Sequence, residues 1–118
     1  MKSVFIVANW KSNKTVAEAD SWLGSFKPLA SGPTIILCAP FTLLHYLHEQ
    51  QSALQLGAQN VSPFGEGAYT GEINAKQLKE LVDWVIIGHP ERRAKFNETD
   101  DILKQKVVQA KSAGLNVI

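Results

Sequence analysis

The chain has 118 residues, 45% of them hydrophobic, and a formal net charge of +1, which suits one small domain with its own core. Its longest basic run is Arg92-Arg93, too little for the clustered basic face of a nucleic-acid-binding protein, so we expect no nucleic-acid partner. No apolar stretch approaches the roughly 18 residues of a membrane span. Met1-Lys2 precedes only a short apolar run, so we expect no signal peptide and a cytoplasmic location.

Strand-like apolar runs alternate with helix-like segments along the whole chain. The runs begin near Val4, Thr34, Leu54, Trp84 and Asn116. The helices are predicted from Thr15 to Lys27, Phe41 to Gln51, Asn74 to Val82 and Thr99 to Gly114. Thr15, Asn74 and Thr99 can cap helices, and Gln77 completes a capping box with Asn74. This order predicts an α/β fold with a parallel sheet and right-handed crossovers.

Two of these helices have apolar faces at helical spacing. The first has Val16, Ala19, Trp22, Leu23 and Phe26 on one face, and the second has an apolar face of Leu43, Leu44 and Leu47.

Polar residues follow two of the apolar runs directly. His89 comes after Trp84 to Ile87 and Gly88, where Pro90 can open a short helix. Asn9 and Lys11 come after Val4 to Ala8. In parallel α/β folds the carboxyl ends of strands bind ligands. A lone histidine there could equally be a loop residue bonded to a carbonyl, but a second polar strand end favours a site for an anionic substrate.

Three other features are weighed on their chemistry. The long connection from Asn60 to Glu72 is either a functional or interaction loop or a flexible surface loop. Cys38, the single cysteine, lies in an apolar run and is expected to be a buried structural thiol. His45 and His48, with Glu49 beside them, lack a third convergent ligand, so we expect a solvated helix face and no metal.

Four motifs resemble the amino-terminal half of the triosephosphate isomerase family. They are ANWK (Ala8 to Lys11), APF (Ala39 to Phe41), GAQNVSPFGEGAYTGEI (Gly57 to Ile73) and GHPERR (Gly88 to Arg93). The resemblance implies a TIM (β/α)8 barrel, with residues 1–118 supplying the first four strand–helix units and the fifth strand. It also implies cofactor-free interconversion of dihydroxyacetone phosphate and glyceraldehyde 3-phosphate through an enediolate.

The resemblance also implies roles for individual residues. Lys11 would pair with the substrate phosphate and with developing charge, and Asn9 would orient the substrate. His89 would be the electrophile; a neutral histidine in this role is a known feature of the family and is taken from the resemblance. Glu91 would be a partner of Lys11 or of the catalytic cluster. Pro90 stands where the family usually has serine, which should push His89 towards extended geometry.

Partners follow from the same resemblance. Tyr69, Thr70 and Gly71 would belong to a loop that enters a neighbouring subunit, which implies a homodimer of barrels. The family's glutamate base, lid and later phosphate-binding glycines belong to the carboxyl-terminal half. We therefore expect this chain to be inactive alone and to need that half. Two alternatives remain open, namely a self-associating half-barrel scaffold and a phosphate-binding module without catalysis.

Overall fold

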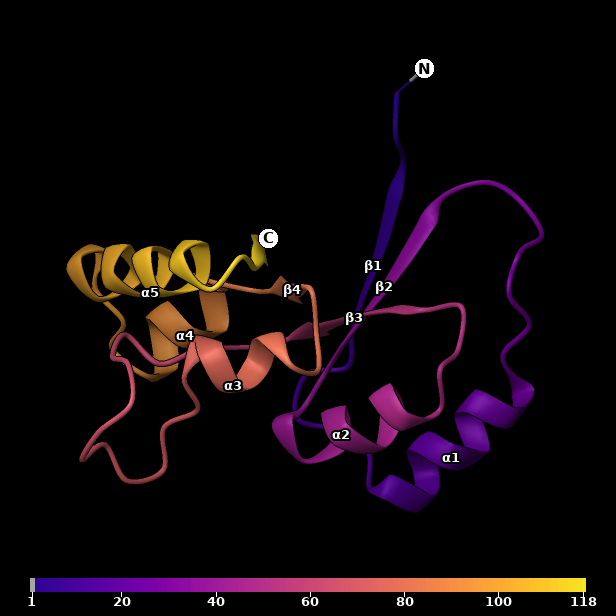
Figure 1. Cartoon of the computed structure of the whole chain (residues 1–118), viewed down its shortest axis with the longest axis horizontal. Coiled ribbons are helices and arrows are strands. Elements are labelled where there is room, and N and C mark those ends of the chain that lie inside the picture. The colour runs from indigo at the N-terminus through magenta and orange to yellow at the C-terminus, as the bar shows by residue number, and fades with distance from the viewer. Residues whose placement is uncertain (1) are drawn as a thin grey trace.

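Five parallel strands lie in chain order across one sheet in the computed structural model, which describes residues 2–118 (Figure 1). The strands are β1 (Phe5–Asn9), β2 (Thr34–Ala39), β3 (Gln55–Ala58), β4 (Trp84–Val85) and β5 (Asn116–Val117). Each strand pairs in parallel with the next along the chain. Sequential strand order with helical connections is the construction of a (β/α) barrel wall. The prediction of an α/β half-barrel is therefore confirmed.

The helices occupy the connections between the strands. They are α1 (Val16–Ser25), α2 (Phe41–Glu49), α3 (Ala75–Lys79), α4 (Pro90–Lys95) and α5 (Asp100–Ser112). Figure 1 shows α1 and α2 beside one another near one end of the sheet, with α3, α4 and α5 gathered at the other. Among residues 2–118, no helix is long and apolar enough to cross a membrane.

The predicted helix starts are confirmed by their hydrogen bonds. Thr15 Oγ1 accepts from the N–H of Glu18 at 3.2 Å, and the Glu18 carboxylate accepts from the N–H of Thr15 at 3.1 Å. Asn74 and Gln77 form the same reciprocal pair at 3.0 Å in both directions. Thr99 Oγ1 accepts from the N–H of Ile102 at 3.3 Å. Local capping chemistry therefore sets where three of the helices begin.

Several helices and strands are shorter than the sequence predicted. Helix α1 ends at Ser25 because Phe26 is already extended, with ψ of 128°, rather than at Lys27. Helix α3 ends at Lys79, three residues before Val82. Strand β4 has two residues where the apolar run predicts four. The N–H of Ile86 still bonds to the carbonyl of Ala58 in β3, and that of Ile87 to the carbonyl of Ile118, which follows β5. Ends of elements depend on what packs against them, which a local pattern does not contain.

The two predicted apolar helix faces had different outcomes. Leu43, Leu44 and Leu47 of α2 are all buried, as predicted. On α1 only Ala19 is fully buried; Trp22, Leu23 and Phe26 pack partly against the core. Val16 is 46% exposed, so this end of the predicted apolar face is not covered in the described chain. It is the first residue of α1.

The sheet is apolar on both faces. On the helix side, the core includes Leu37, Leu56 and Val85. On the opposite side, Ile36, Cys38 and Ile86 form a smaller cluster with Trp84. The buried Cys38 confirms a structural thiol, and burial raises the pKa of that thiol to about 11.

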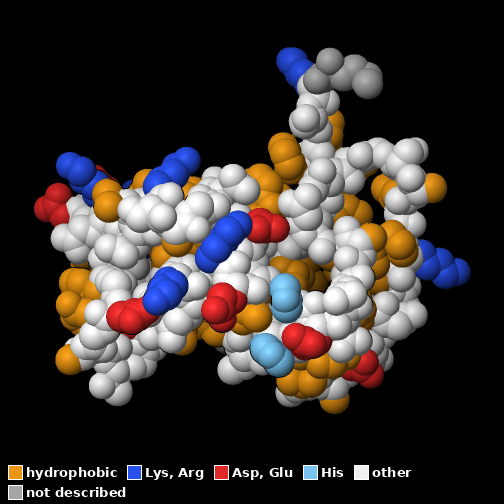
Figure 2. Space-filling view, viewed as in Figure 1, with side chains coloured by type: hydrophobic (Ala, Val, Ile, Leu, Met, Phe, Trp, Pro, Cys, Tyr) orange, Lys and Arg blue, Asp and Glu red, His pale blue; other side chains and the backbone are white. Residues whose placement is uncertain are grey.

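Strand β1 carries the most exposed part of this apolar sheet. Residues 4–7 (Val4, Phe5, Ile6 and Val7) are 40–59% exposed, and Figure 2 shows hydrophobic side chains reaching the surface beside this part of the chain. An edge strand with apolar side chains on both faces presents surface that proteins normally cover.

Gly57 of β3 faces Cys38 too closely to carry a side chain. A Cβ at Gly57 would lie 2.6 Å from Cys38 Sγ and 3.3 Å from Trp84 Cβ. We expect Gly57→Ala to lower the free energy of unfolding by about 1–3 kcal/mol, as overpacking does, measured by urea unfolding of the chain. The loss of stability should be smaller in a Cys38→Ala background.

Gly24→Ala on α1 is the matched control. A Cβ at Gly24 would meet nothing within 4 Å, so this change should be neutral or stabilising. Equal losses in both backgrounds would contradict the steric explanation.

Candidate functional site

A cleft of about 310 Å³ lies at the carboxyl ends of β1 to β4. Its lining brings together every residue that the sequence singled out as catalytic or substrate-binding: Asn9, Lys11, His89 and Glu91. They come from the end of β1 and from the β4–α4 junction, about 80 positions apart in sequence. Parallel strands bring their carboxyl ends to one edge of the sheet, which is why these segments meet.

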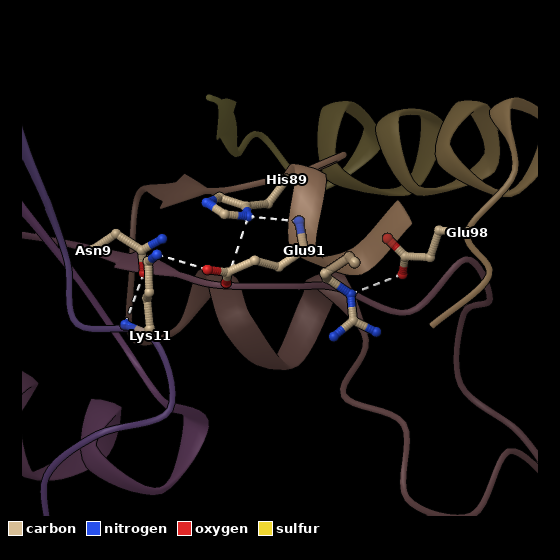
Figure 3. A network of polar contacts seen from close by, with 6 residues as sticks. Asn9, Lys11, His89, Glu91 and Glu98 are labelled. Carbon is tan, nitrogen blue, oxygen red and sulfur yellow. Dashed lines mark hydrogen bonds and ion pairs between the residues drawn. The ribbon is translucent and has the colours of Figure 1, made fainter. Parts of the chain in front are cut away.

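Lys11 is held in a disfavoured backbone conformation. Its φ is +55°, in the left-handed region that costs a non-glycine residue roughly 1–2 kcal/mol. Its N–H donates to Asn9 Oδ1 at 2.9 Å (Figure 3). The preceding Trp10 is fixed on several sides: its N–H bonds to the Cys38 carbonyl at 3.0 Å, its carbonyl accepts from Asn13, and its ring packs edge-on against Trp22.

The Lys11 ammonium and the Glu91 carboxylate form an ion pair across the cleft, with Nζ and Oε1 2.6 Å apart (Figure 3). The hydrogen bond from Lys11 lowers the pKa of the Glu91 carboxyl. The two side chains are 53% and 43% exposed, so water and ligands can reach both. The pair is neutral overall, but it keeps the Lys11 ammonium at an open cleft, where an anion would compete with Glu91 for it.

His89 is the N-cap of α4. Its Nδ1 accepts from the N–H of Glu91 at 3.1 Å (Figure 3). A ring nitrogen that accepts carries no proton, so a neutral imidazole in this arrangement has its proton on Nε2 and donates from there. His89 Nδ1 also lies 3.7 Å from Glu91 Oε2, which would be an ion pair only with a protonated ring. We assign the neutral form because the shorter contact, with the backbone N–H, requires an acceptor.

Pro90 occupies the first position of α4. His89 has φ of −54° and ψ of 137°, which is the extended geometry predicted for a residue before proline. Proline lacks an N–H, but the first position of a helix needs none for an internal bond. Proline at position 90 thus leaves in place the capping hydrogen bond from the N–H of Glu91 to His89 Nδ1.

A buried ionic network behind the cleft was missed by sequence reasoning. Glu98, 9% exposed, accepts from Arg92 Nε at 2.9 Å and also pairs with Lys106, which is 4% exposed. Lys106 Nζ also donates to Asn60 Oδ1 at 2.7 Å. Burial opposes ionisation of Glu98, but hydrogen bonds from Lys106 and Arg92 outweigh it, so the pKa of this carboxyl is lowered. The sequence does contain one signal that Lys106 is buried: its spacing puts it on the same face of α5 as Leu103 and Ala110, which are both buried.

The long loop is ordered by its own contacts. The rings of Phe64 and Tyr69 stack with centroids 4.3 Å apart. Glu66 accepts from Lys76 of α3 at 2.6 Å, and the N–H of Ser62 donates to the carbonyl of Ile73 at 2.8 Å. The predicted interface residues Tyr69, Thr70 and Gly71 are exposed and are absent from the cleft lining.

The histidines of α2 lie apart from the cleft. The side chain of His45 is 77% exposed, and its Nε2 is 3.8 Å from Glu49 Oε1. Within residues 2–118, no group of three or more histidine, cysteine or acidic side chains is placed to hold a metal ion.

An open parallel sheet with an ammonium, an amide and an imidazole at its carboxyl edge defines the class: the amino-terminal part of a (β/α)-barrel protein with a polar cleft. The sequence model described as triosephosphate isomerase matches residues 4–118. The chain belongs to the triosephosphate isomerase family.

Relatives of the chain include three bacterial triosephosphate isomerases. The protein from Synechocystis sp. is 45% identical over 122 aligned residues, covering 98% of this chain and 50% of the relative. The proteins from Dictyoglomus turgidum and Alkaliphilus metalliredigens are each 44% identical, covering 93% of this chain and 47% and 46% of the relatives. The chain thus spans about half the length of the curated relatives it matches.

Proposed function

We propose that this chain supplies the substrate-binding and electrophilic half of a triosephosphate isomerase. The assembled enzyme would interconvert dihydroxyacetone phosphate and glyceraldehyde 3-phosphate through an enediolate. The observation that carries the proposal is the convergence of Lys11, Asn9 and His89 on one cleft from two distant segments. The family membership narrows the reaction from a general phosphate-ester chemistry to this isomerisation.

Each side chain has a role that its chemistry suits. The Lys11 ammonium is a compact positive charge for the substrate phosphate and for charge that develops on the substrate oxygens. Asn9 offers an amide for orienting the substrate. His89, with its proton on Nε2, donates to the carbonyl oxygen as it becomes an enediolate oxygen and then moves protons between the two oxygens.

Glu91 acts through Lys11. Its carboxylate lies 2.6 Å from the ammonium and holds it over the cleft until a substrate anion takes over part of that interaction. Glu91 is thus a positioning residue in this proposal. It does not abstract the proton from carbon, because its hydrogen bond with Lys11 lowers its pKa and makes it a weaker base.

Proton abstraction from carbon would come from the carboxyl-terminal half of the barrel. We propose that this half covers the exposed apolar residues of β1 and contributes the glutamate base, the lid and the phosphate-binding glycines. We further propose that assembled barrels pair as homodimers in the cytoplasm. The loop at Tyr69, Thr70 and Gly71 would enter the other subunit near its Asn9 to Asn13 segment.

Fusion of the two halves tests the proposal directly. Residues 1–118 are joined to the carboxyl-terminal half of the Synechocystis relative, and this fused barrel is assayed for isomerase activity in both directions. We expect activity from the fused barrel and none from residues 1–118 alone. A folded fused barrel without activity would contradict the proposal, as would full activity of residues 1–118.

Native mass and calorimetry separate the alternatives. If residues 1–118 form only multiples of 13.0 kDa and do not bind the carboxyl-terminal half, the chain is a self-associating scaffold. If residues 1–118 bind inorganic phosphate by calorimetry while the fused barrel is inactive, the chain is a phosphate-binding module. Heterodimer formation with recovery of activity supports the enzyme.

A further inference from the structure

Gln59 lies where three strands end. It follows β3 directly and lines the cleft. Its side-chain Nε2 donates to the carbonyl oxygen of Cys38 on β2 at 3.0 Å. The same oxygen accepts the N–H of Trp10, which follows β1, also at 3.0 Å. One carbonyl oxygen therefore connects the carboxyl ends of β1, β2 and β3.

The register explains how a glutamine can reach this oxygen. Asn9, Cys38 and Gly57 are neighbours across β1, β2 and β3. Side chains alternate between the faces of a strand, so Gln59, two residues beyond Gly57, is on the same face of the sheet as Asn9. A carbonyl oxygen has two lone pairs, and the donors from Trp10 and Gln59 use both.

The hydrogen bonds to the Cys38 carbonyl matter for the cleft because Trp10, one of the two donors, is followed directly by Lys11. A residue held at positive φ keeps that conformation only when its neighbours determine it. Lys11 has φ of +55° and is fixed by the bond of its N–H to Asn9 and by the anchored Trp10 that precedes it. Gln59 fixes the oxygen on which the Trp10 anchor depends.

We propose that Gln59 is a positioning residue that sets the geometry of Lys11 through the Cys38 carbonyl and Trp10. The inference rests on the proposed function for its effect on turnover, but its structural part stands on the hydrogen bonds alone. Gln59 does not need to touch the substrate to act in this way. It determines where the ammonium of Lys11 is presented in the cleft.

Gln59→Met removes the donor and keeps the length of the side chain. In the fused barrel we expect kcat/KM to fall about tenfold or more, with a higher KM, because a misplaced Lys11 weakens substrate binding as well as the reaction. In residues 1–118 we expect the backbone amide of Trp10 to exchange with solvent about tenfold faster. Gln59→Asn, a smaller change that shortens the reach of the amide, should give the same effects at lower amplitude and covers failure of the methionine variant to fold.

Gln55→Met is the matched control at the other end of β3. Gln55 Oε1 accepts from Trp84 Nε1 at 2.6 Å, and Gln55 is absent from the cleft lining. This variant should lower stability without changing KM or the exchange of Trp10. Equal effects of the two variants on KM would show a general structural role and overturn the proposal.

The two hypotheses fail separately. An inactive fused barrel with wild-type Gln59 rejects the proposed function, and the amide exchange of Trp10 still decides the positioning role. An active fused barrel in which Gln59→Met keeps kcat/KM within twofold, with Trp10 exchange unchanged, rejects the positioning role alone.

Discussion

Lys11→Ala in the fused barrel is expected to lower kcat/KM by several hundredfold. The substitution removes the only cationic side chain that approaches Glu91 closely enough to pair with it among the described residues of the cleft. Loss of one preorganised group that stabilises developing negative charge costs roughly 3–4 kcal/mol of transition-state stabilisation. Steady-state kinetics in both directions measure the change, with ΔΔG‡ taken from the ratio of kcat/KM values.

Lys14→Ala is the matched control for this substitution. Lys14 is a nearby lysine whose ammonium lies 5.2 Å from the centre of the Trp10 ring, and it is absent from the cleft lining. We expect Lys14→Ala to keep kcat/KM within a few fold. Near-normal isomerase activity of Lys11→Ala would reject the role proposed for Lys11, and an equal loss in both variants would indicate a general electrostatic effect.

Lys106→Met is expected to lower the free energy of unfolding by roughly 3–5 kcal/mol, the cost of breaking a buried ion pair by removing one partner. Lys106 is 4% exposed, and its removal leaves Glu98 with Arg92 as its remaining partner and Asn60 Oδ1 without its donor. Methionine replaces the aliphatic stem of the lysine, so little packing is lost. Urea unfolding of residues 1–118 measures the difference.

Lys104→Met on the same helix separates the ion pair from a general effect of methionine. Lys104 is exposed, so the change should stay within about 0.5 kcal/mol, as for surface substitutions away from special features. The double variant Glu98→Gln with Lys106→Met should recover part of the loss, because it removes the buried carboxylate that Arg92 alone would otherwise have to neutralise. A cost for Lys106→Met no larger than that of Lys104→Met would contradict the importance of the network.

The same network predicts the direction of acid sensitivity. Because the pKa of Glu98 is lowered from its ordinary 4.5 in the folded chain, the unfolded chain binds more protons just below pH 4.5. The contribution of Glu98 is therefore complete above pH 4.5 and is lost as the pH falls through the lowered pKa. In Lys106→Met this part of the acid dependence should weaken, since one of the hydrogen bonds that lowers the pKa is gone.

The sequence by itself determined the order of the elements and where several of them begin. Thr15, Asn74 and Thr99 cap their helices as predicted, because a cap is satisfied within three residues along the chain. The apolar face of α2 follows from helical spacing alone. These signals are local, so one sequence contains all the information that they require.

The placement of the site was predictable to the same extent. Asn9, Lys11 and His89 follow apolar runs, and the carboxyl ends of parallel strands share one edge. The alternation of strands and helices was enough to bring these residues together. Two kinds of partner were predicted for Glu91, and the structure places it against both: its carboxylate lies 2.6 Å from Lys11 Nζ, and its N–H donates to His89 Nδ1.

Only the tertiary structure decided the remaining features. Val16 is exposed and Lys106 buried, against the general preferences of their side chains, because the neighbours that cover each position come from distant parts of the chain. The positive φ of Lys11 and the bond from Gln59 to Cys38 likewise depend on contacts between separate strands. Burial and long-range hydrogen bonds are properties of the assembled sheet and its helices, and local residue patterns do not specify them.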